Sequence, residues 1–375
     1  MISAGIIMLG GCAFLSKPKT FSNVSKNELD QYAEKIVDRI SEFPNDAFSN
    51  QLGVDFLFEQ MHSAGFEKSS NDYSLKRGLR EGLSNFNSTM GQEIANGSYE
   101  LLRANVKGGE GHLLFRLNSS NGMNYHDMLI VKENGVVKIG DIYIYASGEN
   151  LSKTLVRTLA SMRDENDEYS TEKLEHVKLI GQAQQQMQKG NYKVANEYLE
   201  ESKSTMGNEK SWHVINITCK SMIDSLQYMT AMRDFGSKFS KDPSWWLMGV
   251  DYYFLLGQYD KAENLLKKLN TKVGGDPLIT LLRGNVYFMK GDFEKSLDFI
   301  NNGLAKMPFE EDFYYTKISC EGNLKKYADL KSTLDTVYVK FGIELDDIDY
   351  SGFEGFMETD HFKNLMESQN FEFSE

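Results

Sequence analysis

Two different spacings of apolar residues divide the first half of the chain. Up to residue 90 apolar positions recur at helical intervals, and from residue 98 they come in shorter runs separated by Gly and Asn turns. The helical runs are Lys26–Phe43, Phe48–Phe66 and Ser74–Met90, and the predicted strands are Ser98–Val106, His112–Asn118, Met123–Lys132 and Val136–Ala146. Helices followed by a four-stranded antiparallel sheet predict an α+β domain over residues 26–160.

This order of elements resembles the cystatin-like and nuclear-transport-factor-2-like folds. The resemblance implies that the helices cover one face of a curved sheet. In domains of this kind, the cone between helices and sheet sometimes holds an acid–base pair.

His126 and Asp141 are the candidate chemistry of this domain. His126 and Asp127 are neighbours on one predicted strand, so their side chains point to opposite faces, whereas Asp141 on the next strand could meet either one. A His beside a carboxylate is what a general base requires. The alternative is that these polar residues bond across the sheet or line its solvent face. We favour the alternative, because a few polar residues are common in a β meander.

The second half of the chain repeats itself. Gly190-Asn-Tyr-Lys-Val-Ala recurs as Gly257-Gln-Tyr-Asp-Lys-Ala and as Gly291-Asp-Phe-Glu-Lys-Ser, and two degenerate copies carry Tyr228 and Tyr327 at the aromatic position. The copies start at residues 190, 226, 257, 291 and 325, so the period is near 34. In the fourth copy, Gly291 suits a tight turn between two helices, and Pro308 ends the second helix.

This pattern resembles the tetratricopeptide repeat, which is a helix–turn–helix unit. The resemblance implies an all-α solenoid of about five repeats over residues 173–345 and a capping helix and tail over residues 346–375. It also implies that the aromatic residues Tyr192, Tyr228, Tyr259, Phe293 and Tyr327 plug the turns. The polar segment 161–172 is expected to link the two domains.

In the tetratricopeptide family the concave face binds peptides or other proteins. The inward-facing positions of the first helices correspond here to Gln184, Asn216, Lys220, Asp251, Phe254, Asn285, Phe288, Met289 and Tyr315. This set is aromatic and rich in amides, which favours a peptide with apolar anchors over one held by its C-terminal carboxylate. The other interpretation, left open, is that Phe254, Phe288 and Met289 are buried against a neighbouring repeat or the first domain.

Composition and charge exclude some classes of partner. The chain has 375 residues and a formal net charge of −13, so it repels phosphate backbones and is not expected to bind nucleic acid. The 6 His have no metal-ligand spacing, and no nucleophile elbow or phosphate loop occurs. We therefore expect no metal, no cofactor and no enzymatic activity. Cys219 and Cys320 are expected to be buried free thiols.

The N-terminus suggests export. Residues 2–11 are apolar or small and too short to span a bilayer, and they end in Leu9-Gly10-Gly11-Cys12. This string resembles the lipobox of bacterial lipoproteins, which implies lipidation of Cys12 and a tether up to residue 25, although no Lys or Arg precedes the apolar run. The expected location is a bacterial membrane, periplasmic or outer, and the alternative is the cytoplasm.

Three functions follow from these patterns. The first is a non-catalytic scaffold that binds a protein or peptide on the concave repeat surface and is anchored through Cys12. The second is a first domain that binds or hydrolyses a small molecule at His126 and Asp141, with the repeats as a docking arm. The third, a nutrient-binding outer-membrane lipoprotein, is disfavoured because the β domain comes first.

Overall fold

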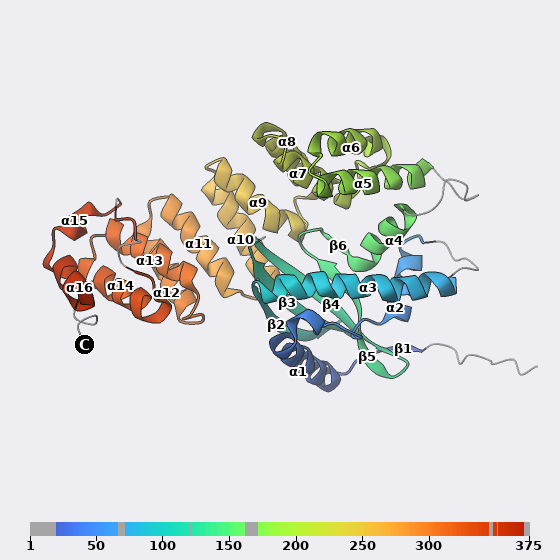
Figure 1. Ribbon diagram of the computed structural model, residues 1–375, viewed down its shortest axis with the longest axis horizontal. Coiled ribbons are helices and arrows are strands. Elements are labelled where there is room, and N and C mark those ends of the chain that lie inside the picture. Colours follow the sequence, from blue (N-terminus) through green and yellow to red (C-terminus); the bar gives the residue numbers. More distant parts are fainter. Residues whose placement is uncertain are drawn as a thin grey trace, which may run out of the picture.

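The computed structural model describes residues 20–66, 72–120, 122–161, 172–344, 348–350 and 352–370. An α+β part comes first and a stack of paired helices follows, which is the predicted order (Figure 1). Cys12 and residues 162–171 of the predicted linker lie outside the described residues. Within the described ranges, no helix combines the length and the apolar character that crossing a membrane requires.

Helix α1 (Lys26–Glu42) begins at a reciprocal cap. The Ser25 hydroxyl accepts the Glu28 backbone N–H, and the Glu28 carboxylate accepts the Ser25 N–H at 2.8 Å. This capping box satisfies two donors that a helix start otherwise leaves open. The remaining helices of the α+β part are η1 (Pro44–Asp46), α2 (Val54–Ser63), α3 (Asp72–Ala95) and α4 (Leu151–Ser161).

The predicted helical run Phe48–Phe66 is wrong in its first part. Residues up to Gly53 instead run beside strand β5 (Val136–Ile144), where Leu52 forms a bridge with Ile139. The Gly53 N–H donates to the Ile139 carbonyl at 2.8 Å, and the Ile139 N–H donates to the Gln51 carbonyl at 2.9 Å. These bonds to the sheet replace the first turns of the predicted helix.

The predicted antiparallel meander is confirmed. Strands β2 (Ser98–Lys107), β3 (Glu110–Ser119), β4 (Gly122–Glu133) and β5 pair in chain order. Two short strands that the sequence pattern missed extend this sheet. Strand β1 (Phe21–Asn23) pairs with the end of β4, and β6 (Glu149–Asn150) pairs with the end of β5.

One face of the sheet packs against the helices of the α+β part. Leu113, Phe115, Met128, Ile130 and Ile142 are fully or almost fully buried there. They form one core with the apolar stripe of α1 and with residues of α2, α3 and α4. This is the arrangement predicted for helices that cover one face of a sheet.

Five helix pairs make up the second part of the chain. The first members of the pairs, here called the first helices, are α5 (Glu172–Gln188), α7 (Lys210–Ser221), α9 (Pro243–Leu255), α11 (Pro277–Met289) and α13 (Glu311–Asn323). The second helices are α6 (Tyr192–Met206), α8 (Ser225–Phe239), α10 (Tyr259–Val273), α12 (Phe293–Leu304) and α14 (Tyr327–Phe341). Each pair corresponds to one repeat of the sequence.

The turns within the pairs explain the repeated glycines. Gly190, Gly257 and Gly291 have φ of 78°, 66° and 75°. In this left-handed region the Cβ atom of an L-residue lies too close to the backbone, whereas glycine has no Cβ atom. The fifth repeat places Lys325 there, at φ 56°. In the second repeat, Asp224 caps α8, which therefore starts one turn before its aromatic Tyr228.

The stack ends in a cap. Helices α15 (Glu354–Met357) and α16 (Asp360–Asn370) follow the fifth pair, and the buried side chains of Phe356 and Leu365 pack with Leu330, Leu334 and Val337 of α14. Within the predicted capping segment, residues 354–357 and 360–370 are helical. It closes the apolar face that the last repeat would otherwise expose.

Candidate partner-binding surface

The second face of the sheet packs on the helix stack instead of meeting solvent. Leu114, Tyr125 and Tyr145 on this face are buried in one core with Trp245 of α9 and Leu269 of α10. Figure 1 shows the sheet lying beside α9 and α10, in the middle of the stack. The sequence left open whether the polar strand residues bond across the sheet or line a solvent face. The second option is wrong for this face, because its aromatic residues are buried by the repeats.

Asp276 is the main polar contact between the two parts. It caps α11, where its Oδ1 accepts the Leu278 N–H at 2.9 Å. The same oxygen accepts from Arg116 of β3 at 2.5 Å, and Oδ2 accepts from the Tyr125 hydroxyl of β4 at 2.7 Å. The side chains of Arg116 and Asp276 are both 0% exposed. A charged pair this deeply buried holds only when each charge keeps its partner.

Asp242 repeats this arrangement at the start of α9. Its carboxylate accepts from the Ser244 backbone and hydroxyl, from Lys210 of α7 at 2.5 Å and from the Tyr143 hydroxyl of β5 at 3.4 Å. Burial alone would raise the pKa of Asp242, but the bonds from Lys210 and Ser244 hold it below its usual range. Sheet residues thus contact the N-terminal ends of two successive first helices.

The C-terminal ends of the first helices carry exposed apolar side chains. Met222 follows α7, Leu255 and Leu256 end α9, and Met289 ends α11, with exposed fractions of 58%, 68%, 41% and 51%. We call these four residues the open edge. They recur at the same place in three consecutive repeats, on the ends of the helices away from the caps that bind the sheet.

Three of the nine predicted groove residues are buried or paired. Asn216 is 4% exposed, and its Oδ1 has no hydrogen-bond partner among the described residues. Lys220 bonds to Glu200 at 2.9 Å, and Asn285 accepts from the Thr316 hydroxyl at 2.9 Å. Asn285 and Thr316 therefore join the neighbouring first helices α11 and α13.

Two predicted groove residues pack within their own repeats. Phe254 lies edge-on to Tyr259 at a centroid distance of 5.8 Å, and Phe288 lies edge-on to Phe293 at 5.2 Å. Each of these two Phe rings is half-buried. One part of the ring packs against the aromatic residue of the turn, and the rest is accessible to solvent. This outcome lies between the two interpretations that the sequence left open.

The other four predicted residues are exposed. Gln184 borders a hollow between α4 and α5, Met289 belongs to the open edge, and the Tyr315 hydroxyl donates to Glu311, which raises the pKa of Tyr315 to about 12. Asp251 is also accessible to solvent, yet burial by the surrounding protein raises its pKa. All four side chains are therefore accessible to solvent.

His126 is a buried structural residue, bonded to Tyr99 of the core between the sheet and the helices of the α+β part. The Asn124 carbonyl oxygen accepts the N–H groups of Tyr125 and Ala146, so its amide nitrogen points at His126 Nε2, 3.1 Å away. Nε2 of the neutral ring therefore accepts a hydrogen bond from this amide, and the ring proton is on Nδ1. Nδ1 donates that proton to the Tyr99 hydroxyl oxygen at 2.9 Å. Both ring nitrogens are occupied, and burial lowers the pKa of His126 to about 4.

Asp141 serves a different element. It accepts from the backbone and the hydroxyl of Ser152, at 3.1 Å and 2.7 Å, at the start of α4. In the sheet His126 pairs with Ile144 and Asp141 with Leu129, so their positions differ by an odd number of residues and their side chains point to opposite faces. The structure does not bring together the acid–base pair that the second hypothesis requires.

Sequence reasoning named Met289 of the open edge but missed Met222, Leu255 and Leu256, and it missed the Arg116–Asp276 contact. The one signal for the open edge was that α9 is apolar on every side, in the string Trp245-Trp-Leu-Met-Gly-Val-Asp-Tyr-Tyr-Phe-Leu. Cys219 and Cys320 are buried thiols, as predicted, and burial raises the pKa of both. The described residues hold no group of three His, Cys, Asp or Glu arranged to bind a metal.

No family model matches the chain. No curated protein sequence matches it either. The solved structures that align with it include three at low identity. PilW, a type IV pilus biogenesis factor, is 11% identical, with 55% of this chain and 97% of PilW covered and a TM-score of 0.40. MamA from Desulfovibrio magneticus RS-1 is 15% identical, with 48% and 99% covered and a TM-score of 0.39.

The third is a tetratricopeptide repeat protein from Parabacteroides merdae, which is 14% identical, with 44% and 79% covered and a TM-score of 0.32. Because all three TM-scores are below 0.5, the assignment rests on the helix pairs and turns of this chain. The likeness of the first part to the cystatin-like and nuclear-transport-factor-2-like folds stays a prediction. The second part is a tetratricopeptide-like stack of helix pairs that binds its own sheet along one side.

Proposed function

We propose that this protein is a non-catalytic scaffold that holds a peptide segment of a partner protein on the first helices of its repeats. The observation that carries the proposal is the open edge. Single exposed apolar residues are common, but exposed apolar residues that gather on one surface mark interaction sites, and here they recur in three consecutive repeats beside the partly exposed rings of Phe254 and Phe288.

The geometry of stacked helices favours a peptide over a globular surface. Neighbouring helix axes lie about 8–10 Å apart, so apolar sites recur at about that interval. Three residues of an extended chain cover about 10 Å, and so do two turns of a helix. A peptide with apolar anchors at either spacing matches the open edge. Backbone amides of such a peptide would hydrogen-bond to exposed polar side chains. Asp251 lies on α9, the helix that carries Leu255, and Gln184 lies on α5 of the first repeat.

A peptide-display selection on the full-length chain tests this function. We expect enriched peptides to share at least two apolar anchors and to bind at least about tenfold more weakly to a Leu255→Ser/Met289→Ser variant, since burying one such side chain contributes about 1.5–3 kcal/mol. Val339→Ser is the matched control, because Val339 is 79% exposed on the second helix α14. If the control weakens binding as much as the double variant, the open edge is not the site.

We also propose that Cys12 anchors the protein to a membrane. The support is the string Leu9-Gly10-Gly11-Cys12 and the polar residues 16–20 that follow it. The tether expected up to residue 25 is shorter than predicted, because Phe21–Asn23 form strand β1 and Ser25 caps α1. Labelling of producing cells with a radioactive fatty acid should mark the unmodified chain and leave Cys12→Ser unlabelled. Equal labelling of both would refute lipidation at this residue and favour the cytoplasmic alternative.

A further inference from the structure

A cavity in the α+β part lies apart from both the open edge and His126. It measures about 360 Å³ and is bordered by the loop before α2, by α3 and by the hairpin of β4 and β5. Its volume falls within the range of about 300–1,000 Å³ that small-molecule pockets occupy. The apolar part of its wall includes Leu52, Val54 and Leu83, of which Leu52 and Leu83 are buried.

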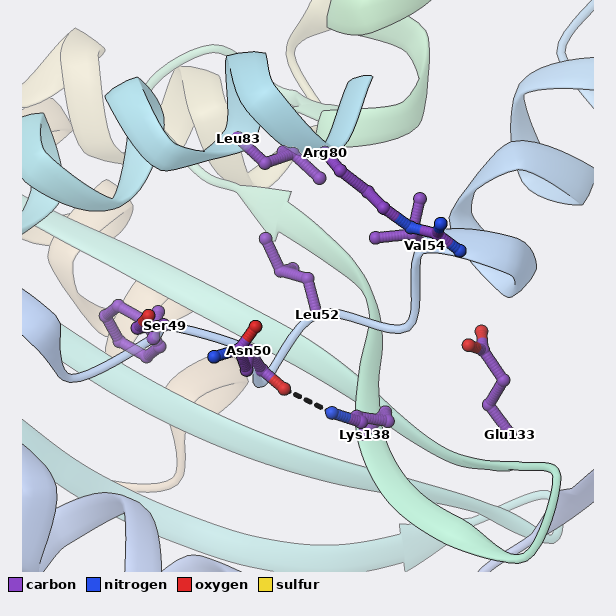
Figure 2. A pocket seen from close by; sticks show the side chains of 9 residues that line it. Ser49, Asn50, Leu52, Val54, Arg80, Leu83, Glu133 and Lys138 are labelled. Atoms are coloured by element: carbon purple, nitrogen blue, oxygen red, sulfur yellow. Dashed lines mark hydrogen bonds between the residues drawn. The ribbon is translucent and has the colours of Figure 1, made fainter. Parts of the chain in front are cut away.

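Two cations border the same cavity. Figure 2 shows Arg80 reaching in from α3 and Lys138 standing on the opposite side of Leu52 on β5. Among the described residues, neither side chain has an acidic partner. Lys138 donates to the backbone carbonyl of Asn50, which leaves two of its three donors free. The five donors of Arg80 form a planar fork suited to an oxyanion.

The carboxylate of Glu133, which is the acidic group among the described lining residues, is already engaged through one oxygen. Glu133 Oε2 accepts the Phe56 N–H at 2.9 Å, and it thereby caps α2, which has no side-chain cap of its own. A side chain at Gly53 would stand 3.0 Å from this oxygen, so glycine is what lets the carboxylate reach the helix. Glu133 therefore serves the fold, while the two cations retain free donors.

The wall of the cavity is held in place by the sheet. The loop that carries Leu52 is bonded to β5 through Gly53 and Gln51, and Asn50 sits in the left-handed region at φ 60° with its carbonyl on Lys138. Asn tolerates this backbone conformation better than most residues. The apolar floor and Lys138 are thus positioned before any ligand arrives.

We infer that this cavity binds a small amphipathic anion, with its oxyanion head attracted to the cationic border that Arg80 and Lys138 form and its apolar body on Leu52, Val54 and Leu83. The inference does not depend on the repeats. It gives the α+β part a ligand site that differs from the His126 and Asp141 pair predicted from the sequence. A carboxylate and a phosphate monoester share the head-group chemistry that these two cations recognise.

Calorimetric titration of the full chain with four octyl compounds below their micellar concentrations tests the inference. Octanoate and octyl phosphate carry the two head groups, whereas octanol is neutral and octyltrimethylammonium is cationic. We expect at least one of the two anions to bind, and the tighter one identifies the head group. Octanol should bind at least about tenfold more weakly than that anion, because the charge-assisted bonds to the head group are lost. Hexanoate should bind more weakly than octanoate, by about fourfold per methylene.

Arg80→Gln and Lys138→Gln should each weaken binding of that anion at least about tenfold. Arg77→Gln is the matched control: it removes the same charge one turn earlier on α3, where Arg77 is exposed and near Glu81, and it should bind like the parent chain. Binding of octanol or of the cationic compound as tightly as the anions would overturn the inference. So would an unchanged affinity in both Arg80→Gln and Lys138→Gln.

Discussion

At the scale of single residues, a few polar side chains are fixed by complete networks. His126 accepts one amide proton from Asn124 and donates its own to Tyr99, so the neutral ring fits and a second ring proton would face the Asn124 amide. The pKa of His126 is lowered to about 4 by burial, against an ordinary value of 6.5. The sequence showed a His near carboxylates, but the register and the tautomer that decide its role come from the folded sheet.

The stability of the protein should therefore depend on pH through His126. Between pH 6.5 and about 4 the unfolded chain binds a proton at this ring that the folded chain does not bind, so stability falls as the pH falls. The excess stability of the parent chain over His126→Gln should shrink by up to about 3 kcal/mol from pH 7 to pH 4. Urea unfolding at several pH values measures this.

His112 supplies the control for that measurement. A hydrogen bond to Asp127 raises the pKa of His112, so its contribution is present at low pH and is lost as the pH rises through the raised value. His112→Gln should change the pH dependence in the opposite direction to His126→Gln. A parallel change in the two variants would contradict the roles assigned to both rings.

Lys325 is strained where other repeats use glycine. It has φ 56° at the turn between α13 and α14, and a side chain in this region costs about 1–2 kcal/mol, partly offset by the extra freedom of glycine in the unfolded chain. Lys325→Gly should stabilise the protein by about 0.5–1 kcal/mol in urea unfolding. Lys325→Ala keeps the Cβ atom and should give no such gain; an equal gain from alanine would exclude strain as the cause.

At the scale of elements, local signals were sufficient wherever a segment satisfies its own backbone. Turn glycines and the Ser25 cap marked helix ends, and Gly/Asn turns marked the hairpins. The signals failed where a distant segment completes the bonding. The loop at Leu52 pairs with Ile139, and α2 is capped by Glu133 from a hairpin 77 residues away. No window of local sequence holds both partners of such contacts.

The cap at the end of the stack should contribute strongly to stability. Phe356 is fully buried, with its ring near Tyr327, Tyr350 and Phe362. Phe356→Ala should cost about 3–5 kcal/mol, because it removes a large buried side chain and leaves a cavity. Met357 is the adjacent control, since it is 46% exposed and its change to Ala should cost under about 0.5 kcal/mol. Similar losses in thermal or urea unfolding would show that α15 does not pack as described.

At the scale of the whole molecule, the sheet and the repeats form one body. The strand sequences carried a hint of this, because His112-Leu-Leu-Phe is apolar on successive residues and therefore on both faces of the sheet. The partner of the second face could not be predicted, since it depends on the curvature of five stacked repeats. The sheet therefore covers the N-terminal ends of α9 and α11, and the exposed open edge lies at the C-terminal ends of the same helices.

The contact between Arg116 and Asp276 should hold these two parts together. Arg116→Met leaves the Asp276 carboxylate buried without its cation, which should cost about 3–5 kcal/mol of unfolding free energy. Tyr125→Phe removes only the hydroxyl bond to Asp276 and should cost about 1.5–3 kcal/mol. If Arg116→Met costs no more than an exposed charge such as Arg233→Met, the two parts are not coupled through this pair.

The central claim is that the open edge contacts a protein partner, and site-specific photo-crosslinking tests it most directly. A photoreactive phenylalanine analogue would replace Leu255, Met289 or Val339, one at a time, in the full chain expressed in cells that naturally make it. Positions 255 and 289 should give the same crosslinked protein, and position 339, on α14, should give none. Crosslinking from position 339 alone, or equally from all three positions, would contradict the account.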